Sequence, residues 1–220
     1  MSATPIESEF ADRGSPVEPR ESPARSRILV AAIQVFGTYG FSKSTVQEIA
    51  AAAGVSKPLF YRHFKNKQVV FEVVVERVFS DWHEAITEHV ARADGTTVEA
   101  LRVLFHGALE YAQARPFLNH LLARDSQLLL STQSGIWDRA CQALRSLIEQ
   151  ILRRGIEAGE VRSDVCVEHM ADLLTEINFV YTNRQLHMGT AIETDLAEDI
   201  ARCMFAAVTP VRASRVKERL

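Results

Sequence analysis

The feature that most constrains the fold is the stretch GVSKPLFYRHFKNK, residues 54–67, which gathers aromatic and basic residues around one proline. Ser56 can cap a helix whose first turn holds Pro58, where the missing N–H costs no helical hydrogen bond and the fixed φ angle is favourable. Phe60 and Phe64 are four residues apart and therefore share one face of that helix. The stretch predicts a short helix with a buried aromatic face and a basic face.

The residues before this stretch predict two more helices. Apolar residues in the range 28–36 follow helical spacing, and the two glycines and the tyrosine within residues 37–40 predict the end of the first helix. Thr45 and Glu48 have the spacing of a capping box, and Gly54 supplies the left-handed turn that ends the second helix. Two helices joined by a glycine-containing turn and set on a preceding helix form a helix-turn-helix plan.

The rest of the chain also reads as helical. Asn66 can cap a long fourth helix, although the β-branched residues of VVFEVVVERVF are also typical of a strand; the length and the cap favour a helix. The last two long helices are predicted near residues 165–187 and 194–208. Because nothing predicts a β-sheet or an internal repeat, the expected fold class is all-α.

Charge is distributed unevenly along the chain. Residues 20–67 carry eight Lys and Arg against two acids, whereas the whole chain has a net charge of −3. An acidic protein with one basic segment directs that segment towards a polyanion.

In a helix-turn-helix the first turn of the second helix reaches base edges, and here it holds Lys57, Pro58 and Leu59. Side chains and helix starts around it can contact phosphates, namely those of Thr45, Tyr61, His63 and Lys67.

The run TVQEIAAAAGVSKPLFYRHFKNKQVV, residues 45–70, resembles the N-terminal signature of the TetR family of bacterial transcriptional repressors. The resemblance implies the DNA contacts named above and adds Gln47. It also implies a homodimeric repressor whose last two helices pair across the dimer. A small molecule, expected to be largely apolar, would bind the C-terminal domain, move the fourth helix and release a palindromic operator.

These expectations divide the chain into an N-terminal three-helix helix-turn-helix DNA-binding domain and a larger C-terminal helical ligand-binding and dimerisation domain. The predicted boundaries are 1–22 for a disordered tail, 23–68 for the DNA-binding domain, 69–210 for the helical domain and 211–220 for a basic tail. Polar or aromatic residues among apolar helical positions are the candidate ligand contacts, namely His106, Tyr111, Trp137, Glu176, Asn178 and Tyr181.

One alternative function remains open from the sequence. The protein could be a ligand-independent DNA-bound adaptor or activator whose helical domain binds a protein partner. An enzyme is not expected, because the sequence has no phosphate loop, nucleophile elbow or Glu-x-x-His pair. No cofactor is expected, and no metal either, since Cys166 and His169 lack a third ligand.

The sequence predicts a cytoplasmic protein. Its three cysteines are scattered, no signal peptide is readable, and no apolar run is long enough for a membrane span.

Overall fold

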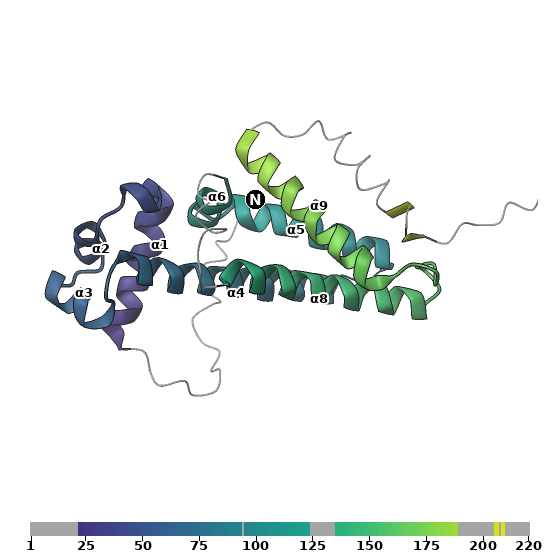
Figure 1. The fold of residues 1–220 in the computed structure, drawn as a ribbon, viewed down its shortest axis with the longest axis horizontal. Coiled ribbons are helices and arrows are strands. Elements are labelled where there is room, and N and C mark those ends of the chain that lie inside the picture. Colours follow the sequence, from purple (N-terminus) through teal and green to yellow (C-terminus); the bar gives the residue numbers. More distant parts are fainter. Residues whose placement is uncertain (1–21, 94, 124–134, 189–204, 207, 210–220) are drawn as a thin grey trace, which may run out of the picture.

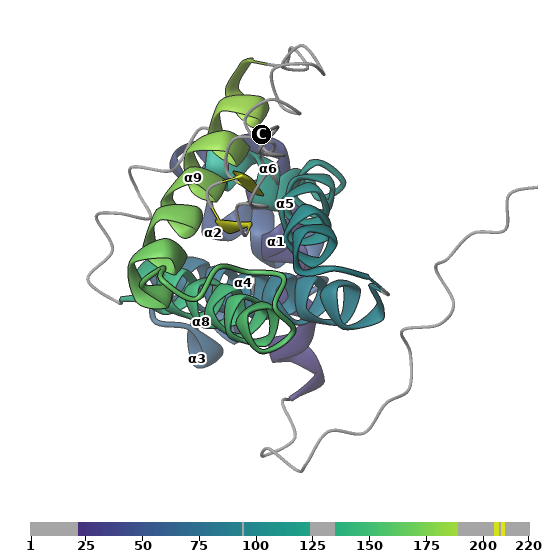
Figure 2. The same cartoon turned by 90° about the vertical axis from the view of Figure 1, so that its right-hand side faces the viewer.

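The computed structural model describes residues 22–93, 95–123, 135–188, 205–206 and 208–209. Helices α1 to α3 form a small unit at one end, which we call the head (residues 22–66), and α4 runs from it along the length of the molecule (Figure 1). Viewed along that length, α5 and α9 lie on opposite sides of the body with α4 and α8 below them (Figure 2). All regular secondary structure in the described residues is helical, which confirms the all-α prediction.

The first helix of the head, α1, spans Pro23–Lys43, and the side chain of Ser22 caps it by accepting from the backbone N–H of Arg25. The helix passes through Gly37 and is interrupted at Gly40, whose φ of 75° lies outside the helical region. The sequence predicts that this helix ends within residues 37–40. The helix continues through Gly37, and its regular conformation is interrupted at Gly40, the last residue of that range.

The caps predicted for the next three helices are confirmed. Thr45 and Glu48 form a reciprocal capping box at the start of α2, Val46–Ala52. Ser56 accepts from the backbone of Leu59 at the start of α3, Lys57–His63. Asn66 caps α4, Lys67–Arg92, so the β-branched run within it is helical, as its length and cap predicted. The four side-chain caps of α1 to α4 fix where each of these helices begins.

The body adds four further helices within the described ranges. They are α5 (Thr97–Gln113), α6 (Pro116–Ala123), α8 (Ile136–Glu157) and α9 (Val167–Met188). Helix α4 packs against α5 and α8, and α8 packs along α9. The observed α9 confirms the helix predicted near residues 165–187. Of the helix predicted at 194–208, the structure describes residues 205, 206 and 208, which are helical. The rest of that segment and the two terminal tails, apart from Ser22, lie outside the described residues, and the domain boundaries stay predictions.

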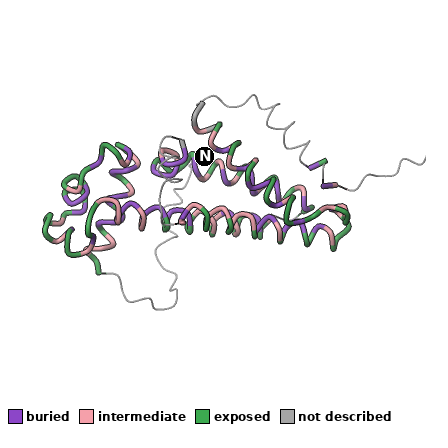
Figure 3. The backbone as a smooth tube through the Cα atoms, viewed as in Figure 1, coloured by how far each residue is buried: buried purple, intermediate pink, exposed green. Residues whose placement is uncertain are grey.

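Two apolar clusters hold these helices together, and Figure 3 shows their buried positions along the chain. The first joins the head to the start of α4 and to α6, and it contains Phe36, Phe60, Phe64 and Phe117. Phe60 and Phe64 are buried, as their shared face predicted. The second cluster joins the far half of α4 to α5, α8 and α9. Head and body therefore share a continuous apolar contact through α1, α4 and α6.

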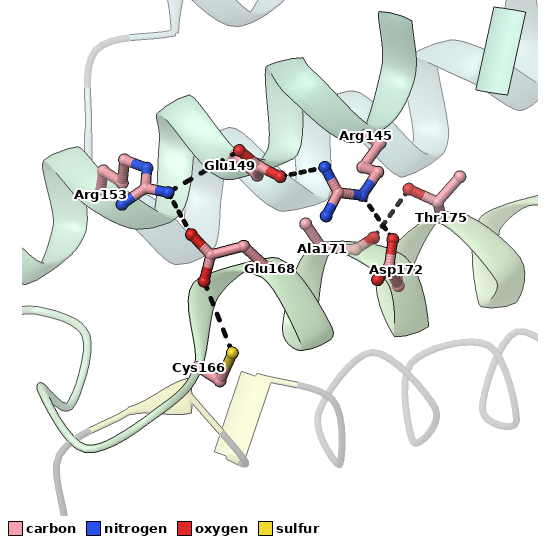
Figure 4. Close-up of polar contacts among 8 residues, drawn as sticks. All are labelled: Arg145, Glu149, Arg153, Cys166, Glu168, Ala171, Asp172 and Thr175. Carbon is pink, nitrogen blue, oxygen red and sulfur yellow. Dashed lines mark hydrogen bonds and ion pairs between the residues drawn. The ribbon is translucent and has the colours of Figure 1, made fainter. Parts of the chain in front are cut away.

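Ion pairs connect the exposed sides of α8 and α9 (Figure 4). Arg145 bonds Glu149 on its own helix and Asp172 on α9, and Arg153 bonds Glu149 and Glu168. Exposed pairs contribute about 0–1 kcal/mol each. They link α9 to α8, and the apolar cluster that both helices share supplies more of the stability.

Candidate nucleic-acid interface and interior cavity

Helix α3 presents its first turn to solvent. Lys57 and Pro58 are exposed, and Leu59 is half-buried. The helix is held from behind by Phe60, which is fully buried, and by the Ser56 cap at its start. A short helix anchored by its apolar face, with its N-terminal turn free, has the form of a recognition helix that enters the major groove.

Tyr61 and His63 flank this turn. The Tyr61 ring packs edge-on against Phe60 with the ring centroids 5.5 Å apart, yet the side chain is 48% exposed. A large aromatic residue so exposed beside a basic helix leaves its hydroxyl available to a phosphate. The Nε2 atom of His63 lies 3.5 Å from the Ser22 hydroxyl, which brings the end of α3 to the start of α1.

Thr45 and Gln47 lie at the exposed start of α2. The Thr45 hydroxyl donates to the Glu48 carboxylate at 2.8 Å, and the backbone N–H of Thr45 donates to the same oxygen. The capping box therefore engages the donors that a phosphate would need from Thr45. Gln47 is exposed, and its predicted DNA contact, like that of Thr45, stays a prediction.

Lys67 has a contact that the sequence did not predict. Its ammonium donates to the carbonyls of Phe41 and Ser44, at 2.6 and 2.7 Å, and lies 4.3 Å from the centre of the Phe41 ring. Burial lowers the pKa of Lys67, and Glu48 opposes part of that shift. In this arrangement Lys67 ties the start of α4 to the end of α1. Its predicted phosphate contact stays a prediction.

The body contains a cavity of about 50 Å³ between α4, α5, α6, α8 and α9. Its walls are mostly aromatic and aliphatic, with a few polar side chains on α4 and α9. The lining residues are Phe79, Trp82, His83, Ile86, Ala108, Leu122, Trp137, Ala140, Cys141, Leu144, Thr175, Asn178, Phe179, Thr182 and Asn183. An apolar cavity with a few polar groups is the usual form of a small-molecule site.

Two of the six predicted ligand contacts line this cavity, Trp137 and Asn178. The other four lie elsewhere: His106 and Glu176 are exposed, and Tyr111 and Tyr181 are half-buried outside the lining. Sequence reasoning missed Trp82 and Thr182. Trp82 could have been found, because it ends the apolar stretch of α4 whose two-sided pattern predicts burial on two faces.

Several polar atoms of the cavity walls are buried without a hydrogen-bond partner. Among the described residues, Trp82 Nε1, Asn178 Nδ2 and Thr182 Oγ1 have none. Asn178 is 1% exposed and Thr182 2%. A buried polar group left unpaired costs about 1–3 kcal/mol, so such groups are rare unless something else binds them.

The titratable side chains of the cavity are uncharged at neutral pH. Burial lowers the pKa of His83 below its ordinary value of 6.5. Burial, together with the nearby carboxylates of Glu176 and Asp138, raises the pKa of the Cys141 thiol to about 11. No Asp, Glu, Lys or Arg lines the cavity, and no cluster of three metal-ligating side chains occurs within the described ranges.

The head and its exposed α3 define the class of this protein: it is a helix-turn-helix DNA-binding protein with a helical body. Comparison with known proteins agrees. Residues 28–74 match the family model described as bacterial regulatory proteins, tetR family. The transcriptional repressor NicS of Pseudomonas putida is 27% identical over 81% of this chain and 84% of its own length. The repressor DhaR of a Mycobacterium species is 28% identical over 70% of this chain and 77% of its own.

Among solved structures, the fatty acid degradation regulator FadR of Bacillus halodurans has the same fold. It aligns with a TM-score of 0.69 and 19% identity over 84% of this chain and 96% of its own. Residues 28–74 therefore match the TetR family of bacterial regulatory proteins, and the similarity to repressors of transcription extends over most of the chain. No helix within the described residues has the length and apolar character that a membrane crossing requires.

Proposed function

We propose that this protein is a homodimeric transcriptional repressor that leaves a palindromic operator when a small molecule binds the cavity. The observation that carries the proposal is that α4 spans both sites. Its first residue, Lys67, is bonded to the end of α1, and its middle residues, from Phe79 to Ile86, form one wall of the cavity. A molecule that displaces this wall therefore acts on the helix that carries the head.

The DNA side of the proposal rests on the exposed residues of α2 and α3. Lys57 can donate to guanine, and Pro58 and Leu59 can contact a thymine methyl group. Tyr61 and His63 flank them and are placed to position the helix by phosphate contacts. Thr45, which caps α2, and Gln47, in the first turn of α2, complete the predicted interface.

Dimerisation is supported by the outer face of α9. Leu173 and Val180 are 52% and 61% exposed and lie two helical turns apart on the same side of the helix. Apolar side chains repeated along one exposed helix face are covered when a second helix packs there. A second copy of the chain placed against α9 would give the two-fold arrangement that a palindromic site requires.

The sign of regulation follows the relatives, since NicS and DhaR are both named repressors. The cavity favours a ligand-gated repressor over the alternative of a ligand-independent adaptor, because an adaptor would have no need of an interior space with unpaired polar groups. The ligand acts by binding the DNA-incompetent conformation more tightly. The protein works by binding, without catalysis, and in the bacterial cytoplasm where the chromosome lies.

The proposal is tested by selecting binding sites from random DNA with the full-length protein and measuring the affinity for the selected site by fluorescence anisotropy. We expect one palindrome to be enriched. Lys57→Ala should relax specificity at one or two base pairs and Tyr61→Phe should weaken binding to all sequences, each by about 1–3 kcal/mol. Arg154→Ala, on α8, is the matched control and should bind normally, because Arg154 lies on the body and, within the described residues, bonds to Gln150 of its own helix. Failure to enrich any palindrome would contradict the repressor proposal.

A further inference from the structure

We infer that the cavity binds an uncharged, mostly apolar molecule that carries a hydrogen-bond-accepting oxygen, such as a ketone. The inference rests on the proposed ligand switch and adds the chemistry of the ligand. It depends on two properties of the cavity walls: which polar groups lack partners, and which charges are present.

The unpaired groups are donors. The indole Nε1–H of Trp82 can only donate, and the amide nitrogen of Asn178 donates as well. The Thr182 hydroxyl is also without a partner and can donate. An acceptor oxygen on a bound molecule would recover the free energy that these buried donors lose when they are unpaired.

Other polar groups of the same walls already have partners. The Thr175 hydroxyl donates to the carbonyl of Ala171 at 2.7 Å, and the Asn183 amide donates to the carbonyl of Leu122 at 2.7 Å. Unpaired polar groups are therefore not a general property of this interior. Three of the four such atoms among the described residues belong to one cavity, on Trp82 of α4 and on Asn178 and Thr182 of α9. The fourth, an oxygen of Glu149, is ion-paired with Arg145.

The charge of the walls disfavours an anion as the ligand. No lysine or arginine among the described residues lines the cavity, and both His83 and Cys141 are neutral there. An anion would be desolvated without a countercharge. It would also be repelled by Glu176 and Asp138, whose carboxylates already raise the pKa of Cys141.

A cation is the strongest rival ligand. Four aromatic rings line the cavity, those of Phe79, Trp82, Trp137 and Phe179, and aromatic faces attract alkylammonium groups. An ammonium is itself a donor, however, and would leave the N–H groups of Trp82 and Asn178 unpaired. An acceptor satisfies them, and the rings supply apolar contact for the rest of the molecule.

The test uses four ring compounds that differ in one group: cyclopentanone, methylenecyclopentane, cyclopentylammonium and cyclopentanecarboxylate. The chain has two tryptophans and both line the cavity, so the two indole N–H resonances of ¹⁵N-labelled full-length protein both report on this site. Trp137→Phe identifies the signal of Trp82. We expect cyclopentanone to bind most tightly and to move the Trp82 signal downfield, as a new hydrogen bond would.

Two substitutions of the same kind on α9 separate a hydrogen bond from a change of shape. Thr182→Val removes an unpaired hydroxyl and should weaken cyclopentanone binding by about two- to tenfold. Thr175→Val removes a cavity hydroxyl that already donates to the carbonyl of Ala171, and it should therefore weaken binding less than Thr182→Val does. Trp82→Phe should reduce the preference for the ketone over the hydrocarbon to a similar extent as Thr182→Val.

Each outcome decides a different question. Equal binding of cyclopentanone and methylenecyclopentane, or tighter binding of cyclopentylammonium or the carboxylate, would overturn the inference and leave the ligand switch standing. If none of the four compounds binds, the cavity is not the ligand site and the inference fails together with the switch. DNA binding, measured separately on the same protein, is not affected by either result.

Discussion

The head and the cavity treat their polar groups in opposite ways. In the head, the side chains of Ser22, Thr45, Ser56 and Asn66 each close the start of a helix, a contribution of about 1 kcal/mol per cap. In the cavity, three residues keep buried polar atoms without partners. The caps fix the geometry of the head. The unpaired groups of the cavity lower the stability of the ligand-free protein, and a bound molecule that pairs them would remove that cost.

The largest test of this comparison is a pair of phenylalanine truncations. Phe60→Ala should lower the free energy of unfolding by about 3–5 kcal/mol, because Phe60 is fully buried in the head. Phe179→Ala should cost about 1–2 kcal/mol, since Phe179 is half-buried and already borders empty space. Urea denaturation followed by circular dichroism measures both. Equal losses would show that the cavity walls are packed as tightly as the head.

A second test addresses the contact that joins the two regions. A Cβ atom at Gly37 of α1 would lie 2.9 Å from the backbone nitrogen of Phe117 on α6, so Gly37→Ala must separate these helices, at a cost of about 1–3 kcal/mol. Gly107→Ala, on α5, is the matched control. Its Cβ would lie an ordinary 3.6 Å from the Ile86 side chain, and the substitution should stabilise the helix by about 0.5–1 kcal/mol.

Thermal unfolding of both glycine variants gives the sign of each effect, and anisotropy with the selected operator gives the DNA affinity. A change in how strongly a bound ligand weakens DNA binding, in Gly37→Ala, would show that the contact between α1 and α6 links the head to the cavity. A stabilising Gly37→Ala would mean that α1 and α6 do not pack closely in solution.

The smallest expected effect concerns pH. Burial lowers the pKa of His83, so the folded protein binds fewer protons at this site than the unfolded chain. The contribution is fully present above the ordinary pKa of 6.5 and is lost as the pH falls through the lowered value. His83→Gln should therefore lose less thermal stability than the wild type between pH 7.5 and pH 5.5. The other titratable side chain of the cavity, Cys141, stays protonated over this range. A steeper loss in the variant would contradict the buried, neutral state of His83.

The sequence was most informative where structure is determined locally. Helix caps depend on residues three positions apart, so Thr45 with Glu48, Ser56 and Asn66 could be assigned correctly from spacing alone. The buried pair Phe60 and Phe64 followed from helical periodicity in the same way. The head was therefore predictable nearly to the residue.

The cavity was not, because its walls come from five helices separated in sequence. Periodicity indicates that a residue such as Tyr111 or Tyr181 is partly buried, but not which helix it faces. The bonds of Lys67 were missed for the same reason: they depend on how the end of α1 meets the start of α4. Trp82 and Thr182 became visible only when the helices were placed together.

The bond from the Asn183 amide to the carbonyl of Leu122 has a mechanical consequence. It attaches the far end of α9 to the last turn of α6, while the first turn of α6 lies against Gly37 of α1. Helix α6 has eight residues and is therefore about 12 Å long, too short to bend appreciably. A displacement of Leu122 by a molecule in the cavity would therefore move α6 as a rigid body and shift its contact with α1. Two helices thus connect the cavity to the head, the long α4 and the short α6, and each contributes residues to the cavity wall.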